Sequence, residues 1–100
     1  MKFIVIAAAL LAPMVAARQF TIFDDRNYEG TGHAENRPDG GPCWNLNGAG
    51  DRGSSVRGGS GCTTFFQQRD CTGASWKQRG NAATVPQFLE DHMWSYINSC

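Results

Sequence analysis

Four cysteines are the residues of this 100-residue chain with the best-defined chemistry: Cys43, Cys62, Cys71 and Cys100. Zinc sites usually need closely spaced ligand pairs such as Cys-x-x-Cys, whereas the gaps here are 19, 9 and 29 residues. An even number of cysteines in a small secreted domain instead predicts two disulfides, with three possible pairings. Because oxidised cysteines are not nucleophiles, we expect no cysteine-based catalysis.

The other reactive side chains form no recognisable catalytic set. There is no Gly-x-Ser-x-Gly nucleophile motif, and His33 and His92 have no triad partner or metal-ligand spacing in the sequence. Asp24, Asp25 and Glu29 resemble paired catalytic carboxylates. They directly follow an apolar segment, however, and are more typical of a solvated turn. We therefore expect that the protein is not an enzyme.

The first 17 residues have the three-part pattern of a secretory signal. Met1-Lys2 gives a positive start, residues 3–14 are mostly apolar, and residues 15–17 are the small residues that a signal peptidase reads. This apolar run is shorter than the ~20 residues needed to span a bilayer. We expect cleavage after Ala17, so that residues 18–100 form a secreted, extracellular protein with no transmembrane segment.

Charge and composition exclude several classes of protein. The formal net charge is zero, and the charged residues (18%) are scattered without runs. No basic patch with interleaved aromatic residues supports a nucleic-acid partner, and no basic amphipathic helix supports binding to a membrane surface. The length allows one domain at most. Twelve glycines, all beyond the signal, argue against a helix bundle.

An internal repeat organises the chain after the signal. Residues 20–23 and 62–66 are β-branched and aromatic, which predicts strands, and each run precedes a polar turn that ends in glycine. Two units of about 40 residues, with short strands and glycine-rich turns, predict an all-β sandwich of two sheets. We also expect a loop over Arg37–Pro42 and a short helical turn over Pro86–His92. The ends of the units agree in three aligned pairs: Asp51 with Asp91, Ser55 with Ser95, and Val56 with Tyr96.

The repeat resembles the βγ-crystallin Greek-key motif, which is marked by an aromatic residue, four residues, a second aromatic, one residue and glycine. Residues 23–30 match this motif fully, and residues 66–73 match it with a cysteine in place of the second aromatic. The resemblance implies one sandwich domain at 18–100, with Greek keys at about 19–59 and 60–100. Its structural residues would be Phe23, Tyr28, Gly30, Ser55, Phe66, Cys71, Gly73 and Ser95.

The resemblance also implies how the cysteines pair. In the family, the third strand of each key crosses to the other sheet. Cys62, at the start of the second unit, would then lie close to Cys100, at the end of the adjacent last strand. Cys43 on the crossed strand would meet Cys71 on the folded hairpin. We therefore expect the disulfides Cys62–Cys100 and Cys43–Cys71.

The ends of the two units resemble the family's calcium-binding sequence, which is two Asn/Asp residues, two variable residues, Ser/Thr and Ser. Residues 50–55 lack only the first acidic position, whereas Trp94 stands where residues 90–95 should have the Ser/Thr hydroxyl. In the family, each calcium site shares ligands between the two units. Calcium takes six to eight oxygen ligands, so we expect each missing oxygen-bearing side chain to weaken calcium binding.

Carried over residue by residue, one calcium site would keep the Ser54 hydroxyl, the Arg52 carbonyl and the Asp91 carboxylate. The other would keep the Asp51 carboxylate and the His92 carbonyl but lose its hydroxyl. We therefore expect at most one degenerate calcium site and no other cofactor. The alternative is that the two aspartates only cap turns, since Asp readily bonds to its own backbone.

These observations favour a secreted, non-enzymatic, monomeric binding protein of microbial type, acting on an unknown protein or cell-surface target. The alternative is a toxin, an antimicrobial or host-directed effector, or a protease-inhibitor-like protein without calcium, because similar folds occur in killer-toxin-like antimicrobial proteins. Two prolines stiffen the 37–42 loop, which lowers the entropy lost on binding, although the loop taken alone is more typical of an ordinary connector between strands. Trp44, Trp76 and Trp94 are candidates for interface anchors or for core packing.

Overall fold

The computed structural model describes residues 17–46 and 50–100 of the chain. The expected signal segment lies outside the described residues except for Ala17, where the first strand begins. Within the described part of the chain, the regular structure consists of β-strands and three-residue 3₁₀ helices. None of these helices is long and apolar enough to cross a membrane.

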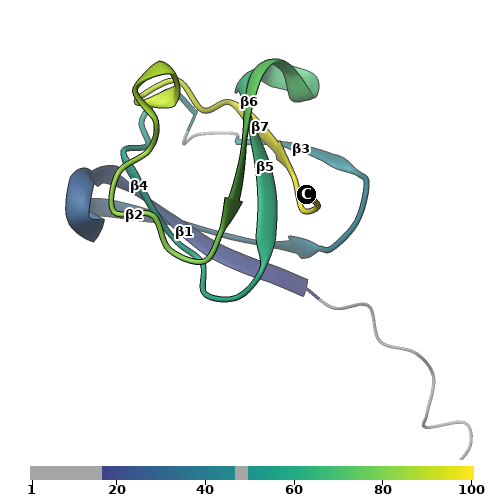
Figure 1. Ribbon diagram of the computed structural model, residues 1–100, viewed down its shortest axis with the longest axis horizontal. Coiled ribbons are helices and arrows are strands. Elements are labelled where there is room, and N and C mark those ends of the chain that lie inside the picture. The colour runs from purple at the N-terminus through teal and green to yellow at the C-terminus, as the bar shows by residue number, and fades with distance from the viewer. Residues whose placement is uncertain (1–16, 47–49) are drawn as a thin grey trace, which may run out of the picture.

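The first repeat unit is an antiparallel hairpin followed by two short strands (Figure 1). The register of the two hairpin strands shifts between Phe23 and Asp25, where the chain bends. The second strand continues to Pro38, so the connection expected over 37–42 is shorter and spans residues 39–42. The elements are β1 (Ala17–Asp25), η1 (Arg26–Tyr28), β2 (Glu29–Pro38), β3 (Cys43–Asn45) and β4 (Ser55–Arg57).

The second unit repeats this plan. Its hairpin has the same register irregularity, here between Phe66 and Gln68. The helical turn expected over 86–92 is a 3₁₀ helix that is buried at Leu89. The elements are β5 (Cys62–Gln68), η2 (Arg69–Cys71), β6 (Thr72–Arg79), η3 (Gln87–Leu89) and β7 (Ser95–Ile97).

Two antiparallel sheets form the sandwich, which confirms the expected all-β Greek-key fold. The strand orders are β2-β1-β4 and β3-β7-β5-β6. β3 therefore leaves its own unit and pairs with β7 of the other unit. The reciprocal crossing by the second unit is reduced to one bridge, between Val56 and Ala82. The four-stranded sheet therefore contains strands of both units, whereas the three-stranded sheet is built from the first unit and receives only this bridge from the second.

The two hairpins also repeat each other in backbone conformation. Tyr28 and Cys71, the second positions of the motif, both lie in the left-handed region, with φ of 61° and 56°. The motif glycines follow with φ of 80° at Gly30 and 83° at Gly73. Glycine adopts this conformation without steric cost. At Gly30, moreover, an added Cβ would lie 2.7 Å from a carboxylate oxygen of Asp25.

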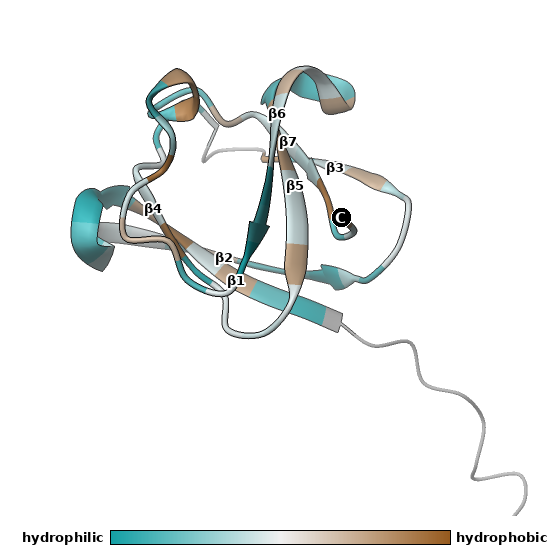
Figure 2. Cartoon of the chain, viewed as in Figure 1, coloured by the Kyte–Doolittle hydropathy of each residue, from teal (hydrophilic) through white to brown (hydrophobic). Residues whose placement is uncertain are grey.

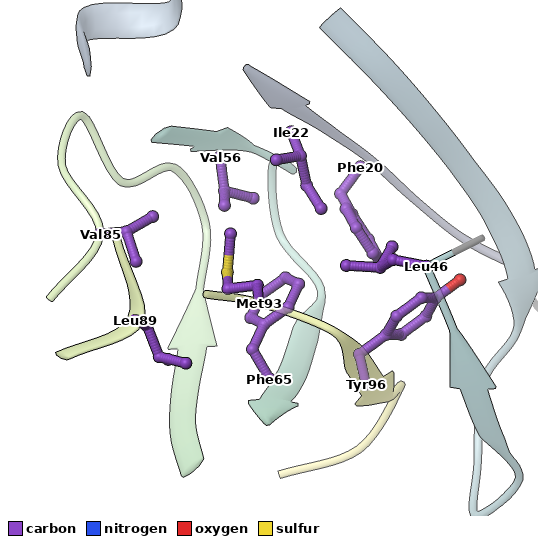
Figure 3. Close-up of a cluster of buried hydrophobic side chains, with 9 residues drawn as sticks. All are labelled: Phe20, Ile22, Leu46, Val56, Phe65, Val85, Leu89, Met93 and Tyr96. Atoms are coloured by element: carbon purple, nitrogen blue, oxygen red, sulfur yellow. The ribbon is translucent and has the colours of Figure 1, made fainter. Parts of the chain in front are cut away.

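Nine buried apolar side chains fill the space between the sheets (Figure 3). The Phe20 ring meets the rings of Phe65 and Tyr96 edge to face, at centroid distances of 5.3 and 4.9 Å. Aromatic pairs prefer this geometry. By contrast, Figure 2 shows hydrophilic residues on β6 and on the turn at η1, where side chains are mostly exposed. The nine residues are Phe20, Ile22, Leu46, Val56, Phe65, Val85, Leu89, Met93 and Tyr96.

Two disulfides join segments that are distant in the sequence. Cys43 on β3 pairs with Cys71 on the folded hairpin, and Cys62 on β5 pairs with Cys100. These are the two pairs that the resemblance implies. The Cα–Cα distances are 6.0 and 5.8 Å, within the usual range for disulfides. Since the first bridge links the crossed strand of one unit to the hairpin of the other, it holds the two units together.

Candidate functional site

The ends of the two repeat units meet through a reciprocal pair of backbone hydrogen bonds. The Asp51 amide donates to the Met93 carbonyl at 3.1 Å, and the Asp91 amide donates to the Gly53 carbonyl at 2.9 Å. Both aspartates have left-handed backbone, with φ of 68° and 61°, which Asp tolerates better than most residues. The two units therefore meet in two equivalent places. We call them the Ser54 half-site, which holds Ser54 and Asp91, and the Trp94 half-site, which holds Trp94 and Asp51.

The Ser54 half-site brings together a hydroxyl from one unit and carboxylates from the other. Ser54 is 5% exposed, and its hydroxyl donates to Asp91 Oδ1 at 3.4 Å. The neighbouring carboxyl of Glu90 has a lowered pKa, chiefly because Arg26 bonds to it. Hydroxyl and carboxylate oxygens are the ligands that calcium prefers. This half-site therefore fits calcium in its chemistry.

Two ion pairs flank the Ser54 half-site. Arg26 donates to both carboxylate oxygens of Glu90, at 2.8 and 3.2 Å. Arg52, whose carbonyl is an expected calcium ligand, directs its side chain to Asp24, with a nitrogen–oxygen distance of 2.7 Å. These guanidinium groups lower the attraction of the half-site for a cation. In residues 17–46 and 50–100, moreover, no group of three or more His, Cys, Asp or Glu side chains could hold a metal ion.

The Trp94 half-site does not fit calcium. The carboxylate expected as its ligand, on Asp51, is paired with His92, with 3.1 Å between Oδ1 and Nδ1. The Trp94 ring lies over Gly50, where an added Cβ would come within 2.2 Å of the ring. Arg69 covers the ring in turn, with its guanidinium carbon 4.7 Å from the ring centroid. The two departures from the calcium-binding sequence, at positions 50 and 94, are therefore in contact and complement each other.

The hairpins above the half-sites are fixed by two equivalent serines, each fully buried. Ser55 accepts from the Tyr28 amide at 3.0 Å and donates to a carbonyl of β1 at 2.6 Å. Ser95 accepts from the Cys71 amide at 2.8 Å and donates to the carbonyl of Gln68 at 2.5 Å. Each serine thus bonds to its hairpin through a donor and an acceptor.

The three tryptophans that are candidate interface anchors are not fully exposed. Trp44 and Trp76 pack against the core from its margin, and all three tryptophans are partly buried. Arg37 covers the Trp44 ring at 4.7 Å, so this arginine is not free at the tip of a loop. All four residues of the connection, Asp39 to Pro42, are exposed.

A polar cluster between the sheets was not apparent from the sequence. The Tyr96 hydroxyl donates to Glu35 at 2.5 Å, and His33 Nε2 lies 2.5 Å from the other oxygen of the same carboxylate. Burial raises the pKa of the Tyr96 hydroxyl, and the hydrogen bond to Glu35 raises this pKa further. His33 thus has a carboxylate partner that we did not expect, and the spacing of two along one strand is the signal that could have indicated it. All four cysteines are oxidised, so the cluster has no thiol nearby to activate.

The comparisons with known proteins agree with this architecture. No protein-family model matches the chain, and no curated protein matches it significantly in sequence. The βγ-crystallin from Ciona intestinalis is similar in structure, with a TM-score of 0.66, 22% identity and coverage of 81% of this chain and 99% of that one. A βγ-crystallin domain from Clostridium beijerinckii gives a TM-score of 0.67 at 22% identity, over 80% of this chain and 95% of that one. A Flavobacterium johnsoniae domain gives 0.60 at 22% identity, over 78% and 90%. The chain therefore has a βγ-crystallin-like fold, and at these identities the similarity carries no further assignment.

Proposed function

We propose that this chain is a secreted, non-enzymatic binding protein with a single weak calcium site at the Ser54 half-site. One observation carries the calcium proposal: the Ser54 hydroxyl and the Asp91 carboxylate come from different repeat units and lie 3.4 Å apart. The Arg52 carbonyl and water would complete the oxygen ligands. Bound calcium would supply a positive charge that links the two units at this end of the sandwich.

Weak affinity is expected because of the charges around this half-site. The Glu90 carboxylate is already neutralised by Arg26, and Arg52 contributes a second guanidinium close by. Extracellular calcium modules commonly have dissociation constants of 10⁻⁴–10⁻³ M. We place this site at about the millimolar end of that range.

A thermal melt of the oxidised protein, with 10 mM calcium chloride or with EDTA, tests the calcium proposal. With a dissociation constant of about 1 mM, calcium would stabilise the fold by about 1.4 kcal/mol, which raises Tm by roughly 5–10 °C in a domain of this size. Asp91→Asn should abolish the shift, since it removes a ligand charge but suits the left-handed backbone. The matched control is Asp51→Asn in the Trp94 half-site, which should keep it.

Coincident melts with and without calcium would contradict the calcium proposal. They would favour the alternative function, a toxin, effector or inhibitor in which the remaining calcium residues have no ion to bind. An equal loss of the shift in the Asp51 and Asp91 variants would instead mean that the effect is not specific to this half-site.

Secretion is supported by the two disulfides, because such bonds persist in oxidising compartments. The first strand begins at Ala17, so cleavage after that residue would leave the remainder of β1 intact. Amino-terminal sequencing of protein recovered from the culture medium should begin at Arg18. Recovery of uncleaved protein inside the cells only would contradict this part of the proposal.

A further inference from the structure

A polar groove lies on the outer face of the three-stranded sheet. It has a volume of about 430 Å³, within the range of ligand pockets. Gln19 pairs with Asn36 across β1 and β2, and Thr21 lies between Ala34 and Arg57 in the next row. The groove contacts β1 at Gln19–Thr21, whereas the Ser54 half-site contacts β1 at its other end, so the two sites are separate.

The walls of this groove are held in place before any ligand binds. The loop between β4 and β5 runs beside the start of β1 (Figure 1), and the amides of Gly58 and Gly59 both donate to Asn81 Oδ1, at 2.8 and 3.0 Å. The buried Arg18 side chain also donates to the Gly58 carbonyl. Preorganised walls favour binding because less conformational entropy is lost.

Arg57 forms one side of the groove and is itself oriented. Its guanidinium carbon lies 4.2 Å from the centroid of the Tyr28 ring, a cation–π arrangement that fixes the plane of the guanidinium. In residues 17–46 and 50–100, the side chains of Gln19, Thr21 and Asn36 make no hydrogen bond to another part of the protein. The groove therefore combines a planar donor with amide and hydroxyl groups that are free to bind a ligand.

We propose that this groove binds a neutral oligosaccharide. Sugar hydroxyls both donate and accept hydrogen bonds, and so do the two amides and the hydroxyl that line the groove. A guanidinium presents parallel N–H groups that can bridge neighbouring hydroxyls. Apolar side chains contribute little, because Phe20 is 3% exposed and the other apolar lining residue is Ala34. A peptide with large apolar side chains would find no pocket here.

The groove also extends far enough for more than one sugar ring. A second hollow of about 210 Å³ shares Gln19 and Gly58 with the first and adds Asp39 and Ser60. Glu35 in the first hollow and Asp39 in the second offset the positive charges of Arg57 and Arg18, which favours a neutral ligand over an anion. The ligand class is therefore an extended, uncharged chain of sugars.

Amide chemical shifts of ¹⁵N-labelled protein, titrated with cellohexaose, fully N-acetylated chitohexaose or laminarihexaose to 10 mM, would test this inference. At least one hexasaccharide should perturb the amides of Gln19, Thr21, Asn36 and Gly59. Arg57→Leu and Asn36→Ala should each weaken binding about tenfold, the effect of losing strong hydrogen bonds. The matched control Arg79→Leu changes an exposed arginine on β6 and should leave the affinity unchanged.

Three results would overturn the inference. The first is that none of the three sugars perturbs the spectrum at 10 mM. The second is that the perturbed amides map to another face of the sandwich. The third is that Arg79→Leu weakens binding as much as Arg57→Leu does. Thermal melts of the variants show whether each remains folded, and Asn36→Ala keeps the test valid if loss of the Arg57–Tyr28 contact disturbs the fold.

Discussion

The Ser54 and Trp94 half-sites occupy equivalent places in the two repeat units, yet they hold different side chains. In one, a serine hydroxyl meets the Asp91 carboxylate, as oxygen ligands for calcium would. In the other, an indole ring lies over Gly50 and under Arg69. The backbone bonds of the two aspartates are nevertheless nearly the same. The backbone at this end is therefore alike with two different sets of side chains.

The hairpins differ in a comparable way. In the first, Tyr28 packs edge to face on Phe23, with ring centroids 6.2 Å apart, and Arg57 covers it. In the second, Cys71 replaces the aromatic ring and is bonded to Cys43. A covalent bond thus stands in one unit where side-chain packing stands in the other.

The largest expected effect breaks this covalent link. The double variant Cys43→Ser, Cys71→Ser removes a bridge across a sequence separation of 28 residues, and chain entropy predicts a loss of about 3–4 kcal/mol in the free energy of unfolding. Urea denaturation of oxidised samples measures it. Tyr28→Ala, at the equivalent position of the other hairpin, should lose less because the ring is only partly buried; a larger loss there would reverse our ranking of the hairpins.

Replacing each of the two buried serines should reveal a further difference in stability between the hairpins. Ser55→Ala leaves a hairpin amide and a carbonyl of β1 without partners, which costs about 1–3 kcal/mol. Ser95→Ala removes the same bonds from the second hairpin, but the disulfide at Cys71 still holds that hairpin, so the loss should be smaller. Denaturant midpoints of the two variants measure the difference, and equal losses would mean that the disulfide adds nothing locally.

A double-mutant cycle tests whether Gly50 and Trp94 are complementary. Gly50→Ala places a methyl group against the indole ring and should destabilise the protein by about 1–2 kcal/mol. In a Trp94→Ser background, the same change should cost less than about 0.5 kcal/mol, because the ring is gone. Additive effects in denaturant melts would show that the ring and the glycine do not constrain each other.

The smallest effect concerns pH at the Ser54 half-site. Arg26 lowers the pKa of Glu90 in the folded protein, so the pair contributes stability above the ordinary glutamate pKa of about 4.3. That contribution is lost as pH falls through the lowered value. The difference in Tm between the wild type and Glu90→Gln should therefore shrink between pH 6 and pH 3. Glu29→Gln, an exposed glutamate in β2, is the control and should show no such trend.

The sequence allowed prediction of the fold because its constraints are local and repeated. The spacing from Phe23 to Gly30 specifies a folded hairpin, and a second copy predicts a two-unit sandwich. The replacement at Trp94 was also visible in the sequence. That its ring fills the space above Gly50 was not, since residues 44 apart come together only in the fold.

The groups that remained unpredicted depend on long-range contacts. Tyr96 and Glu35 are 61 residues apart, and no spacing rule connects them. Arg18 directly follows the expected cleavage point, yet it is 4% exposed and bonds to the Thr63 hydroxyl at 3.1 Å. Arginine is rarely buried, so neither composition nor periodicity indicates this position. The groove likewise depends on residues of β1, β2 and the β4–β5 loop.

The bond between Tyr96 and Glu35 has a spectroscopic consequence. The chain contains two tyrosines, and burial raises the pKa of Tyr96. In alkaline difference absorbance, the Tyr96 phenolate signal should therefore be absent from the folded protein and should appear only on unfolding. Because the unfolded chain releases the Tyr96 proton above about pH 10, stability falls from that pH upward. This delayed phenolate signal of Tyr96 is thus an intrinsic optical reporter of contact between the two sheets.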